Sequence, residues 1–322
     1  MFKNKFLYFT AKGGLISILK KIKVFFAITL LIVAYNVCIN IETDYHFDGI
    51  IVYAGEMYNG TALYSVNSKR EQGIFIDTQS NTDFIDYLGF PDFYNNKLIF
   101  TETLSDGIIN VNKFENNEFD TIFSVKDHTV YRPTFYDETT ILYFTSSYSD
   151  RESFILKYDI STSTFDCVLR HTEDYIHPRS NLSVSDEGKI LYVLEGRING
   201  SISEPNRIHM LNSLKEDKSQ EITKGSSPVW LNNKEFIYID NHRIKKFNIE
   251  TQKIEIIKRL NLPQRCTISP DKKYIAVLDN YSVSNGKKTF LTIIPIRGGI
   301  PMKIEVPPIR YMTDSITWIN FK

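Results

Sequence analysis

The chain has 322 residues, of which 42% are hydrophobic and 13% aromatic, so it can bury a large core. Its 38 basic and 38 acidic residues balance, but residues 1–41 hold six lysines and no acidic residue. Residues 42–322 are therefore net acidic, which argues against a nucleic-acid partner, because proteins of that class need a basic face.

The first predicted element is an apolar helix at residues 24–41. This segment contains no charged residue, and its length lies at the short end of the roughly 17–25 residues that a bilayer-spanning helix needs. A lysine cluster ending at Lys23 precedes it, and basic residues favour the cytoplasmic side. We predict a basic cytoplasmic tail at residues 1–23, a transmembrane signal anchor at residues 24–41 and an exported domain at residues 42–322.

Two alternatives to an uncleaved anchor remain open. A cleaved signal peptide has small residues at its cleavage site, and Ala34-Tyr35-Asn36 matches that pattern poorly. Cys38 could carry a lipid, although Val37 stands where a lipoprotein signal has a small residue. The uncleaved anchor predicts a single-pass protein of the bacterial inner (cytoplasmic) membrane, with its main domain on the periplasmic or extracellular side.

From residue 49 onward, short apolar runs alternate with polar turns, which is typical of an all-β protein. One apolar triplet recurs every 40–50 residues or so, at residues 98–100, 141–143, 190–192, 236–238 and 274–276. A short strand and a turn rich in Asn, Asp or Gly precede each copy, and two further strand-like runs follow the better-preserved copies. Four antiparallel strands per repeat predict the blades of a β-propeller.

The two ends of this region complete one further blade. Residues 49–54, 61–66 and 73–77 match the second, third and fourth strands of a blade. The missing first strand appears at residues 315–321, where Trp318 aligns with Trp230. The sequence thus predicts a six-bladed β-propeller closed by the C-terminal strand and preceded by one transmembrane helix. Ring closure removes exposed sheet edges.

Two of the repeats resemble a known motif. S-D-E-G-K-I-L-Y at residues 185–192 and S-P-D-K-K-Y-I-A at residues 269–276 resemble the PD40 (WD40-like) repeats of the TolB-type β-propellers of bacteria. The resemblance covers about residues 45–322 and implies a six-bladed propeller. We expect no counterpart of the separate N-terminal domain of TolB, with the predicted anchor in its place. The motif is informative about the fold and says little about function.

Function is expected at the channel mouth, where loops enter the innermost strand of each blade. The polar residues predicted there are Asp92, Arg132, His177, Arg179, Asn181, Ser227, Gln264, Arg265 and Asp314. If they converge on the ring axis, they form a site for a small polar ligand or for a segment of a protein partner. The alternative is that they are solvated loop residues.

The preferred hypothesis is a non-enzymatic binding or scaffold module of the cell envelope. The rival is a propeller-type enzyme, a hydrolase, lyase or cyclotransferase. That rival requires two or three of His177, Asp92, Asp314 and Arg265 to meet within hydrogen-bonding distance in a closed pocket.

Motifs for catalysis, cofactors or metals are not found. The sequence has no G-x-S-x-G elbow and no phosphate-binding glycine loop. His171 and His177 lack the spacing of a helical metal site. We therefore expect no cofactor and no metal. Cys167 and Cys266 are expected on different blades and unpaired, since a disulfide needs Cα atoms within about 7 Å. The longest insertion, residues 195–207, is expected to lengthen a hairpin in the fourth blade.

Overall fold

The computed structural model describes thirteen stretches of the chain, namely residues 47–57, 60–77, 85–116, 118–126, 128–147, 152–172, 175–176, 182–195, 197–198, 201–202, 206–283, 286–307 and 316–320. The chain divides into two units, Met1–Tyr45 and His46–Lys322, and every described residue belongs to the second. The predicted tail and anchor therefore lie outside the described residues. Within these stretches, no helix has the length and apolarity needed to cross a membrane.

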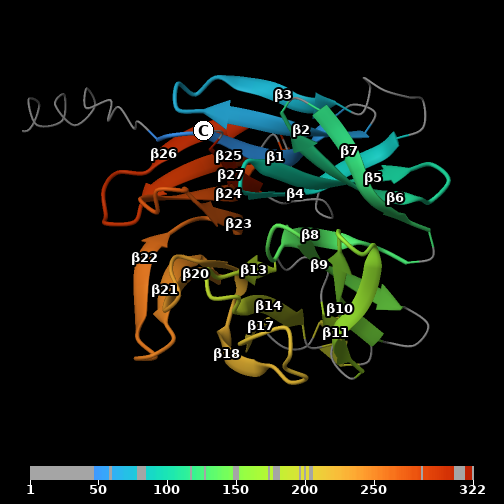
Figure 1. The fold of residues 1–322 in the computed structure, drawn as a ribbon. Coiled ribbons are helices and arrows are strands. Elements are labelled where there is room, and N and C mark those ends of the chain that lie inside the picture. The colour runs from blue at the N-terminus through green and yellow to red at the C-terminus, as the bar shows by residue number, and fades with distance from the viewer. Residues whose placement is uncertain are drawn as a thin grey trace, which may run out of the picture. The chain divides into compact units, whose positions relative to one another are not determined.

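In the described residues, the strands of the second unit form six antiparallel blades (Figure 1). From the inner to the outer strand, the first blade consists of β27 (Ile316–Ile319), β1 (Ile50–Met57), β2 (Gly60–Asn67) and β3 (Gln72–Asp77). The second consists of β4 (Ile85–Tyr94), β5 (Lys97–Leu104), β6 (Ile109–Glu115) and β7 (Glu118–Val125). The third consists of β8 (Tyr131–Phe135), β9 (Thr140–Ser147), β10 (Glu152–Asp159) and β11 (Thr164–His171).

The fourth blade differs from the others because two short strands share its inner position. It consists of β12 (Tyr175–Ile176) and β13 (Ser183–Val184), then β14 (Ile190–Glu195), β17 (Arg207–Leu211) and β18 (Gln220–Lys224). A small hairpin of β15 (Arg197–Ile198) and β16 (Ser201–Ile202) lies between β14 and β17, which confirms the position predicted for the insertion.

The fifth and sixth blades are regular. The fifth consists of β19 (Ser226–Trp230), β20 (Glu235–Asp240), β21 (Arg243–Asn248) and β22 (Ile254–Arg259). The sixth consists of β23 (Pro263–Ile268), β24 (Tyr274–Val283), β25 (Gly286–Pro295) and β26 (Met302–Val306).

The C-terminal strand closes the ring, as the sequence predicts. β27 pairs antiparallel with β1, and Trp318 lies opposite Ile51 in this pairing. The inner strands contact one another in the order β27, β4, β8, β13, β19, β23 and back to β27. The six-bladed all-β propeller is therefore confirmed.

The hydrophobic core lies between blades rather than within them. Each of five buried apolar clusters combines residues of two neighbouring blades, from the first and second through to the fifth and sixth. At the remaining seam, Trp318 of the first blade stacks on Tyr274 of the sixth, with ring centroids 6.5 Å apart. Because apolar burial is the main stabilising term in folding, each blade depends on both of its neighbours.

One predicted alignment is wrong by a single residue. In the fourth and fifth blades the turn after the inner strand closes over four residues, for example from Ser185 N to Lys189 O. In the sixth blade the corresponding bond joins Ser269 N to Tyr274 O, five residues on. The extra residue moves the position equivalent to Tyr238 from Ala276 to Val277. Asp271 belongs to this turn, where its Oδ1 accepts the N–H of Lys273 at 3.1 Å and the hydroxyl of Ser269 at 2.6 Å.

Candidate functional site

A bulge recurs in the inner strands of the second, third and fifth blades. The pairing register shifts between Gly89 and Asp92, between Tyr131 and Thr134, and between Ser226 and Val229. The residues with positive φ in these bulges are Phe90 (53°), Arg132 (53°) and Ser227 (51°). Each precedes a proline, which cannot donate to a sheet ladder and is tolerated at bulges.

These bulges change the side to which later residues point. Side chains alternate along a strand, so one extra residue reverses the phase of everything that follows it. Non-glycine residues with positive φ are uncommon and strained, and the strain recurs here at equivalent places in three blades. The local geometry thus sets which residues at the end of each inner strand face the axis.

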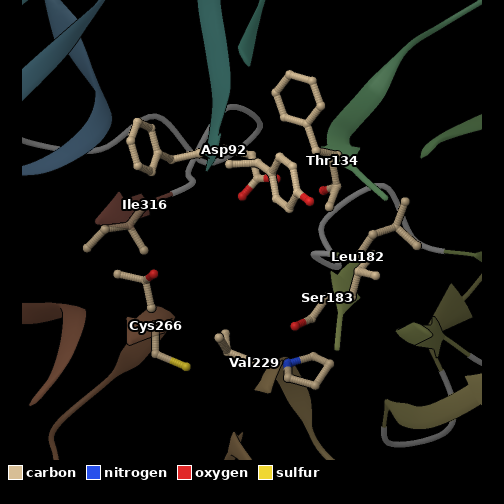
Figure 2. Close-up of a pocket in the computed structure, with 13 residues that line it drawn as sticks. Asp92, Thr134, Leu182, Ser183, Val229, Cys266 and Ile316 are labelled. Atoms are coloured by element: carbon tan, nitrogen blue, oxygen red, sulfur yellow. The ribbon is translucent and has the colours of Figure 1, made fainter. Parts of the chain in front are cut away.

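A cavity of about 150 Å³ lies among the ends of the inner strands (Figure 2). Residues from the inner positions of all six described blades line it. They are Asp92, Phe93, Tyr94, Thr134, Phe135, Leu182, Ser183, Val184, Pro228, Val229, Cys266, Thr267 and Ile316. Apolar side chains make up most of this lining, but polar atoms contribute at least as much of the surface that faces the cavity.

Four polar side chains of the cavity occupy one repeated position. Their partners on the adjacent strand show the equivalence: Asp92 pairs with Ile99, Thr134 with Leu142, Ser183 with Leu191 and Thr267 with Ala276. Val229, opposite Ile237, holds the same position in the fifth blade. One carboxyl group and three hydroxyl groups thus converge from four separate blades. Figure 2 shows the carboxyl group of Asp92 and the hydroxyl group of Ser183 directed into the cavity.

Asp92 has the most perturbed environment in this ring. Its carboxyl group accepts hydrogen bonds from the backbone N–H groups of Phe93 and Phe135 and interacts with the Thr134 hydroxyl. These bonds favour the ionised form, but burial outweighs them and raises the pKa of Asp92 from 3.8 to about 7. A carboxyl group with a pKa near neutrality in a cavity is a candidate functional group.

Two further cavity residues join neighbouring blades. Ser183 Oγ accepts the backbone N–H of Trp230 at 3.0 Å. Cys266 donates its backbone N–H to Ser227 Oγ at 3.1 Å and its thiol to Ser227 O at 3.2 Å. Burial raises the pKa of the Cys266 thiol to about 12, so the nucleophilic thiolate does not form near neutral pH. These groups therefore hold the ring together as well as lining the cavity.

The residues predicted from sequence fall into three groups. His177, Arg179, Asn181 and Asp314 lie outside the described residues. Asp92 lines the cavity. Arg132, Ser227, Gln264 and Arg265 lie nearer the start of their inner strands and are not among the lining residues.

Two of the predicted site residues, Arg132 and Arg265, are buried arginines. Arg132 is 3% exposed, and its guanidinium lies over the Phe90 ring of the preceding blade, 5.0 Å from the centroid. Arg265 is 5% exposed and donates from Nη1 to the carbonyl of Gln264 at 2.8 Å. Gln264 itself donates to Leu262 O at 3.2 Å. The structure thus brings neither arginine to the cavity beside Asp92.

Thr134, Ser183 and Thr267 were missed as site residues. A signal for them exists in the repeat alignment, where each stands two residues before the start of the turn and is equivalent to Asp92. Short hydroxyl residues draw little notice in a sequence dominated by turns, because Ser and Thr are common there.

The chemistry available to the described cavity residues is limited. Nucleophilic catalysis requires a base beside the nucleophile or a lowered pKa. The described lining includes no histidine or lysine, and its one thiol has a raised pKa. No group of three or more His, Cys, Asp or Glu residues suited to a metal ion occurs in the described stretches. The arrangement is suited to holding a ligand.

Comparison with known proteins identifies the fold but no family. No protein-family model and no curated protein matches the sequence. Among solved structures, TolB from Acinetobacter baumannii matches with a TM-score of 0.64 and 12% identity, over 84% of this chain and 67% of that chain. A chain of a nidogen/laminin complex matches with a TM-score of 0.52 and 12% identity, over 84% of this chain and 97% of that chain.

An oligogalacturonate lyase from Vibrio parahaemolyticus is similar at a lower level, with a TM-score of 0.46 and 13% identity over 78% of this chain and 73% of that one. At these identities the likeness concerns the fold alone. The chain has a TolB-like β-propeller fold.

Proposed function

We propose that the protein is a membrane-anchored, extracytoplasmic binding module whose axial cavity receives a small polar ligand or a polar side chain of a protein partner. The observation that carries this proposal is the ring of Asp92, Thr134, Ser183 and Thr267, which converges on one cavity from four blades. A pocket in which apolar side chains surround a few convergent polar groups is typical of ligand sites.

The same cavity favours binding over catalysis. Of the two described residues that the enzyme hypothesis places in a common site, Asp92 lines the cavity and Arg265 does not. Ser183 accepts a backbone N–H from the next blade and has no described base beside it. The matched chain in the nidogen/laminin structure belongs to a protein–protein complex, which is consistent with a partner-binding role for this fold.

A cavity-filling substitution tests the site. Val229 lines the cavity and is partly buried, so Val229→Phe occupies the space, and Val229→Thr is the matched control of nearly unchanged size. The full-length protein is purified from membranes in mild detergent, and native mass spectrometry measures what remains bound. We expect the wild type and Val229→Thr to retain a ligand or partner that Val229→Phe loses. Equal retention by Val229→Phe, with an unchanged melting temperature, would exclude the cavity as the site.

The proposed location rests on the charge-free segment at residues 24–41 and on the lysines before it. The two described cysteines give a direct test, because both are unpaired and Cys167 is exposed whereas Cys266 is buried. A membrane-impermeant maleimide applied to intact spheroplasts should label the wild type at Cys167 and leave Cys167→Ser unlabelled. Labelling of Cys167 only after lysis would place the propeller in the cytoplasm.

A further inference from the structure

We propose that the axial cavity selects a primary ammonium group carried on a short apolar stem, either a free alkylamine or a lysine side chain of a partner. This inference rests on the proposed function, namely that the cavity binds a ligand, and it names the chemical class of that ligand. Three features of the cavity carry it: its unbalanced charge, its supply of hydrogen-bond acceptors and its apolar walls.

The charge of the cavity is one-sided. Among its described lining residues, Asp92 is the only one with a carboxyl group, and none is Lys, Arg or His. Its described contacts are neutral, namely two backbone N–H groups and the Thr134 hydroxyl. Asp92 is partly buried, and a carboxylate held away from water without a counter-ion is unfavourable, so a cationic ligand would supply the missing positive charge. An anionic ligand would instead place a second negative charge beside Asp92.

Nearby lysines are engaged elsewhere. The turns that follow the inner strands carry five lysines, Lys97, Lys189, Lys234, Lys272 and Lys273. Their ammonium groups lie 2.7 Å from Glu138, 2.8 Å from Glu187, 3.0 Å from Glu250, 3.6 Å from Asp186 and 3.1 Å from Asp271, respectively. Each of these described lysines already has an acidic partner, so the counter-ion for Asp92 is expected to come from the ligand.

The hydrogen-bonding groups match an ammonium. A primary ammonium has three N–H donors and no acceptor. The carboxyl oxygens of Asp92 face the cavity (Figure 2). Ser183 Oγ accepts one N–H, from Trp230, and a hydroxyl oxygen has two acceptor sites, so it can accept another. Thr267 adds a further hydroxyl to the lining. A quaternary ammonium would leave these acceptors unused.

The size and the walls favour a short alkyl stem. A dry cavity of the same volume, about 150 Å³, accommodates a six-carbon ring in another protein, so a stem of about four carbons fits. Leu182, Pro228, Val229 and Ile316 supply apolar surface around the polar ring. Burying the methylenes of the stem is favourable. The cavity can therefore bind the ammonium head of the ligand through its polar groups and the alkyl stem through its apolar side chains.

The test compares three probes of equal length on the full-length protein in detergent at pH 8. n-Butylammonium chloride, n-butanol and sodium butyrate are titrated at equal ionic strength, and isothermal calorimetry measures binding. We expect butylammonium to bind at least tenfold more tightly than butanol, and butyrate not to saturate. Asp92→Asn should weaken butylammonium binding at least tenfold and leave butanol binding unchanged. Asp166→Asn is the charge-matched control, because Asp166 lies on β11 and pairs with Lys157 at 3.0 Å, away from the cavity; it should bind butylammonium like the wild type.

Two results would overturn the inference. One is butanol binding as tightly as butylammonium, and the other is butylammonium binding that Asp92→Asn does not weaken. If either occurs while Val229→Phe still loses the retained ligand or partner, the cavity is a binding site for another class of molecule and the proposed function stands. If Val229→Phe retains everything, the proposed function itself is wrong.

A second pair of probes distinguishes the two sources of the ammonium group. Lysine blocked at its α-amino and carboxyl groups presents only the side-chain ammonium, and the same compound acetylated on the side-chain nitrogen is its uncharged control. Binding of the blocked lysine, lost on acetylation, supports a partner's lysine. Binding of butylammonium without binding of blocked lysine supports a free amine.

Discussion

The polar residues near the start of the inner strands are in a different environment from those near the end of these strands. Near the start, Arg132 and Arg265 are almost fully buried, and the Arg132 guanidinium lies over the Phe90 ring of the neighbouring blade. Near the end, Asp92, Thr134, Ser183 and Thr267 line open space. The sequence predicts these two arginines at the channel mouth, but their guanidinium groups contact other parts of the protein. Arg132 packs on an aromatic ring, as a planar guanidinium can, and Arg265 donates to the carbonyl of Gln264. The short polar side chains cannot fill the axis, so they leave a cavity there.

The largest expected effect concerns the pH dependence of stability at the cavity end. Burial raises the pKa of Asp92 from 3.8 to about 7. Between these values the folded protein holds a proton that the unfolded chain has lost, so stability falls as the pH rises from about 4 to 7. Below this window the group is protonated in both states, and above it the loss is complete. A shift of this size corresponds to at most about 4 kcal/mol, because Asp92 is only partly buried.

Asp92→Asn tests this contribution of Asp92 alone. Asparagine does not titrate, and all other titratable groups are the same in the variant and the wild type. Urea denaturation at pH 4, 6 and 8 measures the free energy of unfolding of each. We expect the free energy of unfolding of the variant, relative to that of the wild type, to rise by up to about 4 kcal/mol between pH 4 and pH 8. A difference in the free energy of unfolding that stays constant across this range would show that water solvates Asp92. The two ends of the inner strands would then not differ in the way described above.

The next effect sharpens the contrast at the start of the strands. Ser227 is fully buried, has φ of 51° and accepts the N–H of Cys266. Ser227→Val removes the acceptor and puts a β-branched side chain where φ is positive, so we expect a loss of about 3 kcal/mol. Ser227→Gly removes the same acceptor without the strain, and its loss should be about 1 kcal/mol. Denaturant midpoints of the two variants separate strain from hydrogen bonding, and equal losses would show that the bulge is unstrained.

These bulges also mark what the sequence can and cannot predict. The closure of the ring follows from one alignment, of Trp318 with Trp230, because a strand's pairing is set by side chains that repeat from blade to blade. The direction of Arg132 does not follow, since a single inserted residue reverses the faces of a strand. The sequence does contain a sign of the bulge, a proline after each of Phe90, Arg132 and Ser227. A proline shows that a sheet bond is missing, but it does not show where the next side chain points.

The turn of the sixth blade is likewise predictable from the sequence in its composition but not in its length. The sequence identifies Ser269, Pro270 and Asp271 as turn residues, and the hydrogen bonds of Ser269 and Asp271 agree with that role. Turn composition does not fix turn length, however, because the same residues close loops of four or five residues. The polar ring around the axis therefore becomes visible only when the strand pairings are known.

The smallest expected effects divide the hydroxyl groups of the cavity by role. Ser183 accepts the N–H of Trp230 across the blade seam, so Ser183→Ala leaves a buried donor without its partner and should cost about 1 kcal/mol. Thr267 lines the same cavity, and no interblade bond of its hydroxyl is found in the described residues. Thr267→Val keeps the shape and should change the free energy of unfolding by less than about 0.5 kcal/mol. Chemical denaturation of both variants measures the difference. If Thr267→Val costs as much as Ser183→Ala, the cavity hydroxyls are all structural, and the end of the inner strands resembles their start after all.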